Sequence, residues 1–305
     1  MNSQPPKHLN DYGIPQEAFD WYDEYAHGDI DRRTFLSRLG TLSIAGMSLS
    51  VIAGALTPNY ALAEQVSFND PDITASYLEF DSPAGYGKGR GYFVVPKGVT
   101  QDNPAPVVLV AHENRGLNPY IKDIARRLAK EGFVAFAPDA LFTLGGYPGN
   151  DDQGKAMQQT LDGSKIEQDF MSAAAMLNQH PLSSGKLGMV GFCYGGYLTN
   201  TVAAFMPNIL DAGVPFYGTP ATSHLNQVKG PLMLHFAGLD KRVNATWPDY
   251  ERVLQDNKAN YKAYTYPNAN HGFHNDSTAR YNKEDAELAW SRSIDFFKQY
   301  LTVAA

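Results

Sequence analysis

Two apolar runs separated by an amphipathic segment constrain this chain more than any other feature. Residues 107–111 are apolar at every position, as expected for a strand that is buried on both faces of a sheet. Asn118 and Pro119 have the pattern of a helix N-cap followed by proline in the first turn, and Gly132 ends the helix before the apolar run 133–137. A strand, a helix and a strand in this order predict a parallel sheet covered by helices.

The same alternation continues along the chain. We expect strands at 77–80, 91–95, 107–111, 133–137, 186–190, 212–216, 232–236 and 261–266, and helices at 118–131, 164–179, 198–205, 248–256 and 286–301. No repeat or linker interrupts residues 65–301. The sequence therefore predicts one α/β domain, with a mostly parallel sheet of about eight strands flanked by helices.

The expected strand 186–190 runs into Gly191-Phe192-Cys193-Tyr194-Gly195-Gly196, which precedes a helix. Glycine two positions before and two after a nucleophile, between a strand and a helix, is the nucleophile elbow of the α/β-hydrolase fold. Cys193, the only cysteine in the chain, occupies the position where serine is usual. A lone cysteine is more often a small buried hydrophobe, but this context favours a nucleophile. We predict an α/β-hydrolase fold with Cys193 as the nucleophile.

A thiol nucleophile works best with a base, and in this fold the chain order is nucleophile, acid, histidine. Asp240 follows the expected strand 232–236, and His271 follows the expected strand 261–266. We predict that His271 takes the thiol proton and that Asp240 holds its imidazole in the required tautomer. His274 is the rival base, whereas His235 lies inside a strand and is expected in the core.

Glu113 stands at the end of the apolar run 107–111, next to His112. A charged residue at the carboxyl end of a central strand usually faces the cleft, although Glu113 pairing with Arg115 or capping a helix is the alternative. In this topology the backbone N–H groups of Asn114 and Tyr194 are the expected oxyanion donors.

Residues 1–63 are predicted to be an export signal with an acidic leader, and residues 64–305 the hydrolase domain. Arg32 and Arg33 precede an uncharged run at 39–56 and then Ala61-Leu62-Ala63, the order of a twin-arginine signal. We therefore expect the twin-arginine machinery to recognise Arg32 and Arg33, cleavage after Ala63, and a periplasmic or other extracytoplasmic location. The run is short and weakly apolar compared with the ~20 strongly apolar residues of a permanent span.

The alternative for this region is a buried amphipathic helix with an incidental arginine pair. Ahead of the arginines, residues 15–30 are expected to form a short helix, with Phe19, Tyr22 and Tyr25 at helical spacing.

The formal charge of −7 and the lack of a basic block argue against nucleic-acid binding. The sequence has no histidine, cysteine or aspartate cluster at metal-ligand spacing and no phosphate-cradling loop. We therefore expect neither a metal nor a cofactor, and a small molecule as the partner of the site.

Together these motifs resemble the dienelactone hydrolase family over essentially all of residues 77–301. The resemblance is carried by the segments 112–116, 136–139, 191–196, Gly238-Leu239-Asp240 and 271–273. It implies a Cys-His-Asp triad that hydrolyses an ester or lactone, of the carboxymethylenebutenolidase type, through an acyl-thioester. It also implies that Glu113 interacts with the resting Cys193 and shifts when substrate enters. A thioesterase on the same fold and a non-catalytic binding protein are the alternatives.

One departure from the family bears on the substrate. Family members that cleave dienelactone hold its carboxylate with arginines, one in the loop after Pro138-Asp139 and one shortly after the histidine. Residues 140–147 contain no arginine, and Arg280 is the one candidate stand-in after His271. Phe142, Leu144 and Tyr147 indicate a more apolar pocket lip, compatible with neutral esters or thioesters.

Overall fold

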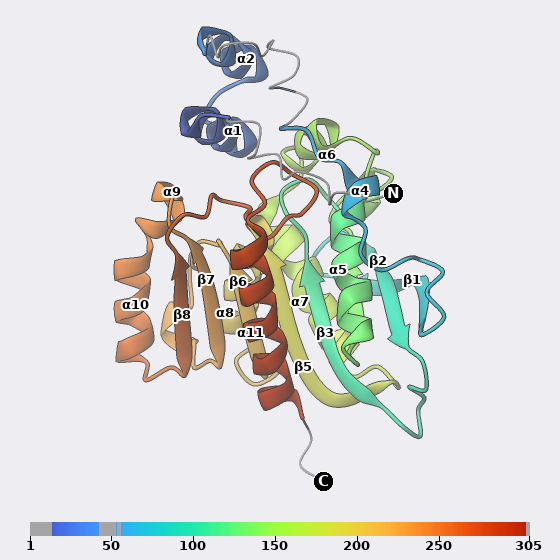
Figure 1. Cartoon of the computed structure of the whole chain (residues 1–305). Helices are drawn as coiled ribbons and strands as arrows, with labels where there is room; N and C mark the ends of the chain where they lie inside the picture. Colours follow the sequence, from blue (N-terminus) through green and yellow to red (C-terminus); the bar gives the residue numbers. More distant parts are fainter. Residues whose placement is uncertain (1–13, 43–52, 54–55, 303–305) are drawn as a thin grey trace.

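A computed structural model of the chain describes residues 14–42, 53 and 56–302. Eight strands form one sheet in the order β1-β2-β4-β3-β5-β6-β7-β8 (Figure 1). The strands are β1 (Ile73–Ser82), β2 (Gly87–Pro96), β3 (Ala105–Ala111), β4 (Val134–Pro138), β5 (Ser183–Phe192), β6 (Ala212–Phe216), β7 (Leu232–Ala237) and β8 (Tyr261–Tyr266). β2 pairs antiparallel with β1 and β4, and every other neighbouring pair is parallel. The predicted fold class and strand number are confirmed.

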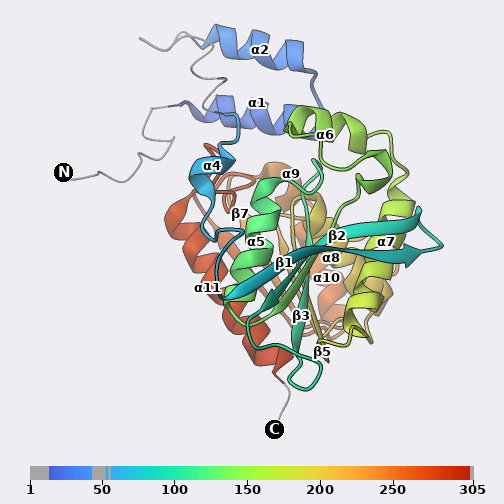
Figure 2. The same cartoon turned by 90° about the vertical axis from the view of Figure 1, so that its right-hand side faces the viewer.

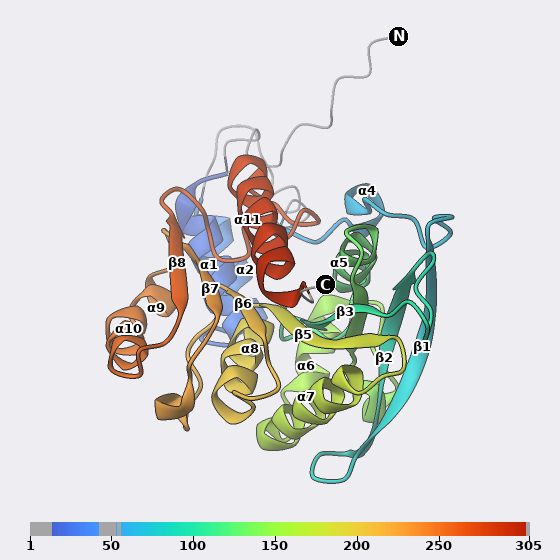
Figure 3. The same cartoon turned by 90° about the horizontal axis from the view of Figure 1, so that it is seen from below.

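Helices cover both faces of the sheet (Figure 3). One face packs against α5 (Pro119–Lys130) and α11 (Lys283–Leu301), and the other against α7 (Gly163–Asn178), α8 (Tyr194–Phe205) and α10 (Trp247–Asp256). The shorter helices are α4 (Tyr60–Ala63), α6 (Asp151–Gln158) and α9 (Lys241–Asn244), with 3-10 turns η2 (Phe142–Leu144) and η3 (Leu225–Gln227). Because β3 lies between these layers, residues 107–111 are fully buried, as their apolar run predicts.

The hydrogen bond of the helix cap confirms the predicted start of α5. The Asn118 side chain accepts from the Ile121 N–H at 3.1 Å, and Pro119 occupies the first turn. The helix ends before Gly132, whose φ of 95° suits glycine.

Several elements differ from the sequence prediction: β1 and β5 are longer than expected, and α2 (Arg32–Thr41), α4, α6 and α9 were not predicted. Helix α8 begins at Tyr194, not at residue 198, because Gly195 and Gly196 remove the apolar periodicity from its first turn. Helix α6 has no apolar stripe, and its polar sequence gave no periodic signal.

The N-terminal residues form two helices, α1 (Gln16–His27) and α2 (Arg32–Thr41), which lie over the end of the domain that carries α6 and α9 (Figures 1 and 2). The predicted helix in 15–30 is therefore present, and Phe19, Tyr22 and Tyr25 are buried. Phe35 of α2 stacks on Tyr25 with ring centroids 5.1 Å apart. Most of the apolar run 39–56 lies outside the described residues. Within the described part of the chain, no helix combines the length and apolarity needed to cross a membrane.

Candidate active site

Cys193 sits on the turn between β5 and α8 in a strained backbone conformation, with φ 56° and ψ −113°. Such a conformation costs a non-glycine residue about 1–3 kcal/mol and persists only where its surroundings hold it. The Cys193 N–H donates to Phe216 O at 3.1 Å, and the Cys193 carbonyl accepts from the N–H groups of Gly196 and Tyr197. The elbow is thus fixed by the neighbouring strand and by the first turn of its own helix.

The two glycines of the motif are required by close backbone approach. A Cβ on Gly191 would lie 1.9 Å from the carbonyl oxygen of Gly195, and a Cβ on Gly195 would lie 2.1 Å from that of Ala111. Neither position accepts a side chain unless the backbone shifts, so this turn requires glycine on both sides of Cys193.

Asp240 and His271 form a buried pair. His271 Nδ1 lies 2.6 Å from Asp240 Oδ2, and Asp240 Oδ1 accepts from the Val243 N–H at 3.0 Å. Burial by itself raises the pKa of Asp240, but His271 and these hydrogen bonds outweigh it and lower the pKa to about 2. Since an ionised carboxylate only accepts, Nδ1 of His271 carries a hydrogen and Nε2 is the nitrogen available for proton transfer.

His271 faces the nucleophile. Its ring nitrogen and Cys193 Sγ belong to a group of atoms that all lie within 4.8 Å of one another, and His271 Nε2 has no hydrogen-bond partner among the described residues. Burial raises the pKa of the Cys193 thiol, but His271 and His27 together outweigh burial and bring that pKa well below its usual range. In turn, burial lowers the pKa of His271, while Asp23, Cys193 and Asp240 raise it well above its usual range. Both directions favour a thiolate beside an imidazolium.

Glu113 is buried at the end of β3, and its Oε2 accepts from Asn275 Nδ2 at 3.1 Å. Burial and the negative charge of Cys193 raise the pKa of Glu113, and Arg280 and Arg115 act in the opposite direction. Arg115 itself lies 3.8 Å from Asp151. The charge of Cys193 therefore reaches the Glu113 carboxyl group, although Glu113 is not among the residues that line the cavity above Cys193.

A cavity of about 280 Å³ opens above Cys193. Its lining consists of His27, Asn114, Cys193, Tyr194, Tyr197, Tyr217, Thr219 and Arg242. The two predicted oxyanion residues, Asn114 and Tyr194, thus stand at the cavity with the nucleophile. The expected lip residues Phe142, Leu144 and Tyr147 are not part of this lining, so that prediction was wrong. Phe142 instead lies against the Arg90 guanidinium, and the Tyr147 hydroxyl donates to Asp151 at 2.7 Å.

The other histidines occupy different environments. His274 Nδ1 lies 2.8 Å from the Tyr120 hydroxyl, and burial lowers its pKa well below the usual range. His235 is fully buried between the Tyr266 and Ser293 hydroxyls, so its predicted core position is confirmed. His271 is therefore the better placed base of the two that the sequence left open.

Sequence reasoning missed five residues of the cavity lining, namely His27, Tyr197, Tyr217, Thr219 and Arg242. His27, in the last turn of α1, has its Nε2 3.5 Å from Cys193 Sγ, and Arg242 of α9 has a guanidinium nitrogen 2.7 Å from the same Nε2. Proximity to Asp240 could have drawn attention to Arg242. No local pattern connects His27 with Cys193, because the contact spans 166 positions of the chain.

His27, Cys193 and His271 offer three atoms of the types that bind a transition metal, and Asp23, Asp240 and His271 offer a second set. At the first set Arg242 already donates to His27 Nε2, so a cation would meet a guanidinium there. At the second set Asp240 is already paired with His271 Nδ1. The arrangement favours proton transfer over cation binding, and we assign no metal.

Comparison with known proteins identifies the family of this chain. The sequence model of the dienelactone hydrolase family matches residues 90–301. The chain belongs to the dienelactone hydrolase family. As a member, it is an enzyme of the class that hydrolyses carboxylic esters and lactones. A second model, described as YqhI-like, matches residues 6–43, which include α1 and α2.

Individual relatives agree with this assignment. Protein Usf of Aquifex pyrophilus is 36% identical over 226 residues, which cover 70% of this chain and 95% of Usf. The fragment YghX of Escherichia coli K12 is 54% identical over 116 residues, covering 38% of this chain and 97% of the fragment. The crystal structure of dienelactone hydrolase from Anabaena variabilis superposes with a TM-score of 0.60 and 22% identity, covering 76% of this chain and all of that one. At that identity the last likeness shows the fold alone.

Proposed function

We propose that this dienelactone hydrolase family member cleaves carboxylic esters or lactones with Cys193 as nucleophile, His271 as base and Asp240 as its orienting acid. The supporting observation is the buried Asp240–His271 pair, whose Nε2 faces the thiol on the elbow. The thiolate attacks the carbonyl carbon, and the N–H groups of Asn114 and Tyr194 stabilise the oxyanion. The intermediate collapses to an acyl-thioester while His271 protonates the departing alkoxide. His271 then removes a proton from water, which attacks the thioester and releases the acid.

We propose that Glu113 interacts with Cys193 while no substrate is bound. Its raised pKa allows it to carry a proton at a position that senses the charge of Cys193. On this view Glu113 exchanges a proton with the resting thiol and moves aside when the substrate arrives, leaving His271 as the partner of the thiolate. The family resemblance implies this role, and the burial of Glu113 and the effect of the Cys193 charge on its pKa support it.

The volume of the cavity favours small substrates. Its volume of about 280 Å³ is at the lower end of ligand sites, which commonly span roughly 300–1,000 Å³. Small esters and lactones fit this space better than the long acyl chains of many thioesters. A relative from Aquifex aeolicus that is named for carboxymethylenebutenolidase activity is 35% identical over 225 residues, which favours lactones as one substrate type.

A substrate panel tests the proposal. Purified full-length protein is assayed on small lactones, short aryl esters and acyl thioesters of matched acyl length. We expect kcat/KM for a small ester or lactone to exceed that for the matched thioester. A thioester preference would favour the thioesterase alternative, and no turnover of any substrate would favour a non-catalytic binding protein that keeps the fold.

We also infer export by the twin-arginine route, which remains a prediction from the sequence. Arg32 and Arg33 are exposed on α2, and the predicted cleavage segment lies in α4, where Leu62 is 76% exposed. Cell fractionation followed by intact-mass measurement is the direct check, with a variant carrying Lys at both Arg32 and Arg33 as the control. We expect a periplasmic chain beginning at Glu64 and its loss in the double-lysine variant. A full-length chain in the cytoplasm would contradict both export and cleavage.

A further inference from the structure

Helix α1 reaches the nucleophile from outside the hydrolase domain. Its His27 contacts Cys193 Sγ at 3.5 Å and packs edge-on against the His271 ring, with centroids 4.8 Å apart. His27 also lines the cavity above Cys193. One residue of the N-terminal helices therefore touches both the proposed nucleophile and the proposed base.

The surroundings of His27 decide what it can do there. Its Nδ1 lies 2.8 Å from the Asp23 carbonyl oxygen, which only accepts, so Nδ1 carries a hydrogen and Nε2 faces Cys193. Arg242 donates to this same Nε2 at 2.7 Å. Both ring nitrogens of His27 are therefore occupied, and neither is free to take the proton of the thiol. His271 has a carboxylate partner instead, so proton transfer belongs to His271 and the contribution of His27 is positional.

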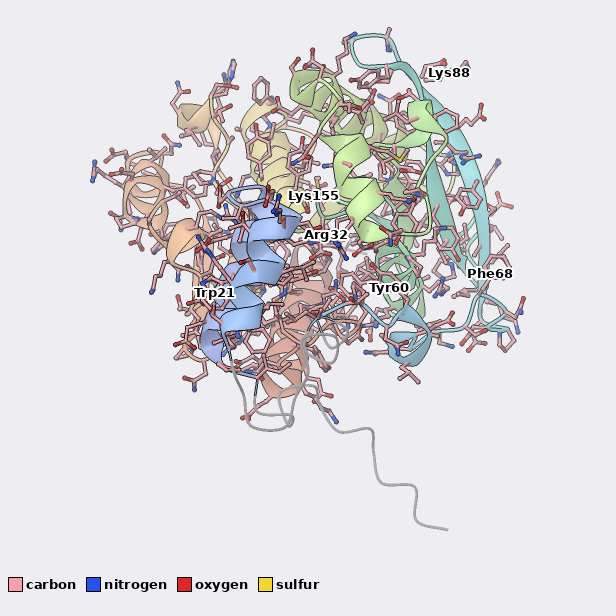
Figure 4. The ribbon with its side chains drawn as sticks, turned by 90° about the horizontal axis from the view of Figure 1, so that it is seen from above. Trp21, Arg32, Tyr60, Phe68, Lys88 and Lys155 are labelled. Carbon is pink, nitrogen blue, oxygen red and sulfur yellow. The ribbon has the colours of Figure 1, made fainter. Side chains whose placement is uncertain are left out.

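Helix α1 is held firmly enough to position a side chain. The Asn114 side chain donates to Ala26 O at 2.9 Å, and the Lys155 ammonium of α6 donates to Tyr25 O. Figure 4, which is seen from above, shows Lys155 next to the two N-terminal helices. The Tyr22 ring is buried beneath α1, with the Arg280 guanidinium 4.7 Å from its centroid. These contacts surround the last turn of α1, which ends in His27.

We propose that α1 forms one wall of the substrate cavity and that His27 is a positioning residue that also limits the size of the acyl group. The imidazole packs against the sulfur and the His271 ring, and its bulk keeps the space near Cys193 small. The inference rests on the proposed ester or lactone hydrolysis and concerns the chain that retains residues 16–41. A chain cleaved after Ala63 would lack this wall.

The test compares full-length wild type with His27→Ala, His27→Gln and Glu17→Ala across a homologous acyl series of the substrate class that wild type hydrolyses. Glu17 is an exposed residue of the same helix and serves as the matched control. His27→Ala is expected to lower kcat for the shortest acyl group about tenfold to 100-fold, because misplacement of reacting atoms by about 1 Å has effects of that size. The ratio of kcat/KM for long over short acyl groups should rise at least about tenfold, since one missing group in a pocket changes discrimination by that order.

His27→Gln retains a polar group of similar reach and is expected to restore most of the wild-type ratio, and Glu17→Ala should match wild type. An unchanged acyl-length ratio in His27→Ala would overturn the inference. An equal increase in kcat/KM for all substrates in His27→Ala would also overturn it, because that result would mean that His27 blocks the entrance to the site in wild type. If wild type hydrolyses no member of any series, the proposed function fails instead.

Discussion

Replacing Cys193 with alanine is expected to lower kcat/KM for ester or lactone hydrolysis by at least about 10⁴-fold, because the acyl-thioester can no longer form. The substitution removes one sulfur atom from a residue that lines an open cavity, so the fold should persist. Steady-state kinetics on the best substrate of the panel measure the loss, and circular dichroism checks that the protein is folded.

Cys193→Ser is the matched comparison for this prediction. A serine hydroxyl has a much higher pKa than a thiol, and the environment that favours a thiolate is not sufficient to ionise it. We therefore expect low activity from the serine variant even though the elbow geometry is kept. Retention of more than about one tenth of wild-type activity in Cys193→Ala would refute the nucleophile assignment.

Replacing His271 with alanine is expected to lower kcat/KM about 10³- to 10⁴-fold and to change the pH dependence of Cys193 alkylation. In wild type the thiol pKa lies well below its usual range because His271 and His27 together outweigh burial. The rate of iodoacetamide alkylation should therefore depend only weakly on pH below the usual thiol pKa of ~8.5. Without His271, only His27 opposes the effect of burial, so the rate should fall more steeply as the pH is lowered, approaching tenfold for each pH unit.

His274→Gln provides the control for the base. His274 is also buried and lies only three positions further along the chain, yet its ring pairs with the Tyr120 hydroxyl. We expect this variant to keep the wild-type alkylation profile and activity within about tenfold, the range of an indirect packing effect. If His274→Gln loses activity and His271→Ala does not, the two histidines have exchanged roles.

The alternation of apolar runs and helical patterns was enough to predict the sheet, because a parallel α/β domain needs strands that are buried on both faces. The sequence order of Cys193, Asp240 and His271 also predicted that they would meet, since the loops after parallel strands share one edge of the sheet. The structure brings all three to that edge, together with Glu113, Asn114 and Tyr194.

Long-range packing could not be inferred in the same way. The apolar positions Phe19, Tyr22 and Tyr25 predicted a helix but gave no indication of the surface that it covers. Its contacts with Asn114, Lys155 and Arg242 come from three separate parts of the fold, and none has a signature in the sequence of α1 itself. The prediction of an apolar lip was wrong for a related reason. Phe142 contacts the Arg90 guanidinium and Tyr147 donates to Asp151, and both contacts lie away from the cavity.

The sequence by itself determined the α/β architecture, the position of Cys193 on a tight turn and the identity of its proposed acid and base. These features depend on local periodicity, on glycine at close approaches and on chain order. Only the tertiary structure decided that His27 stands against the sulfur, that Arg242 faces the cavity and that His274 does not. Each of those outcomes depends on how distant surfaces pack, and packing distributes its free energy over many contacts that leave no pattern in any one segment.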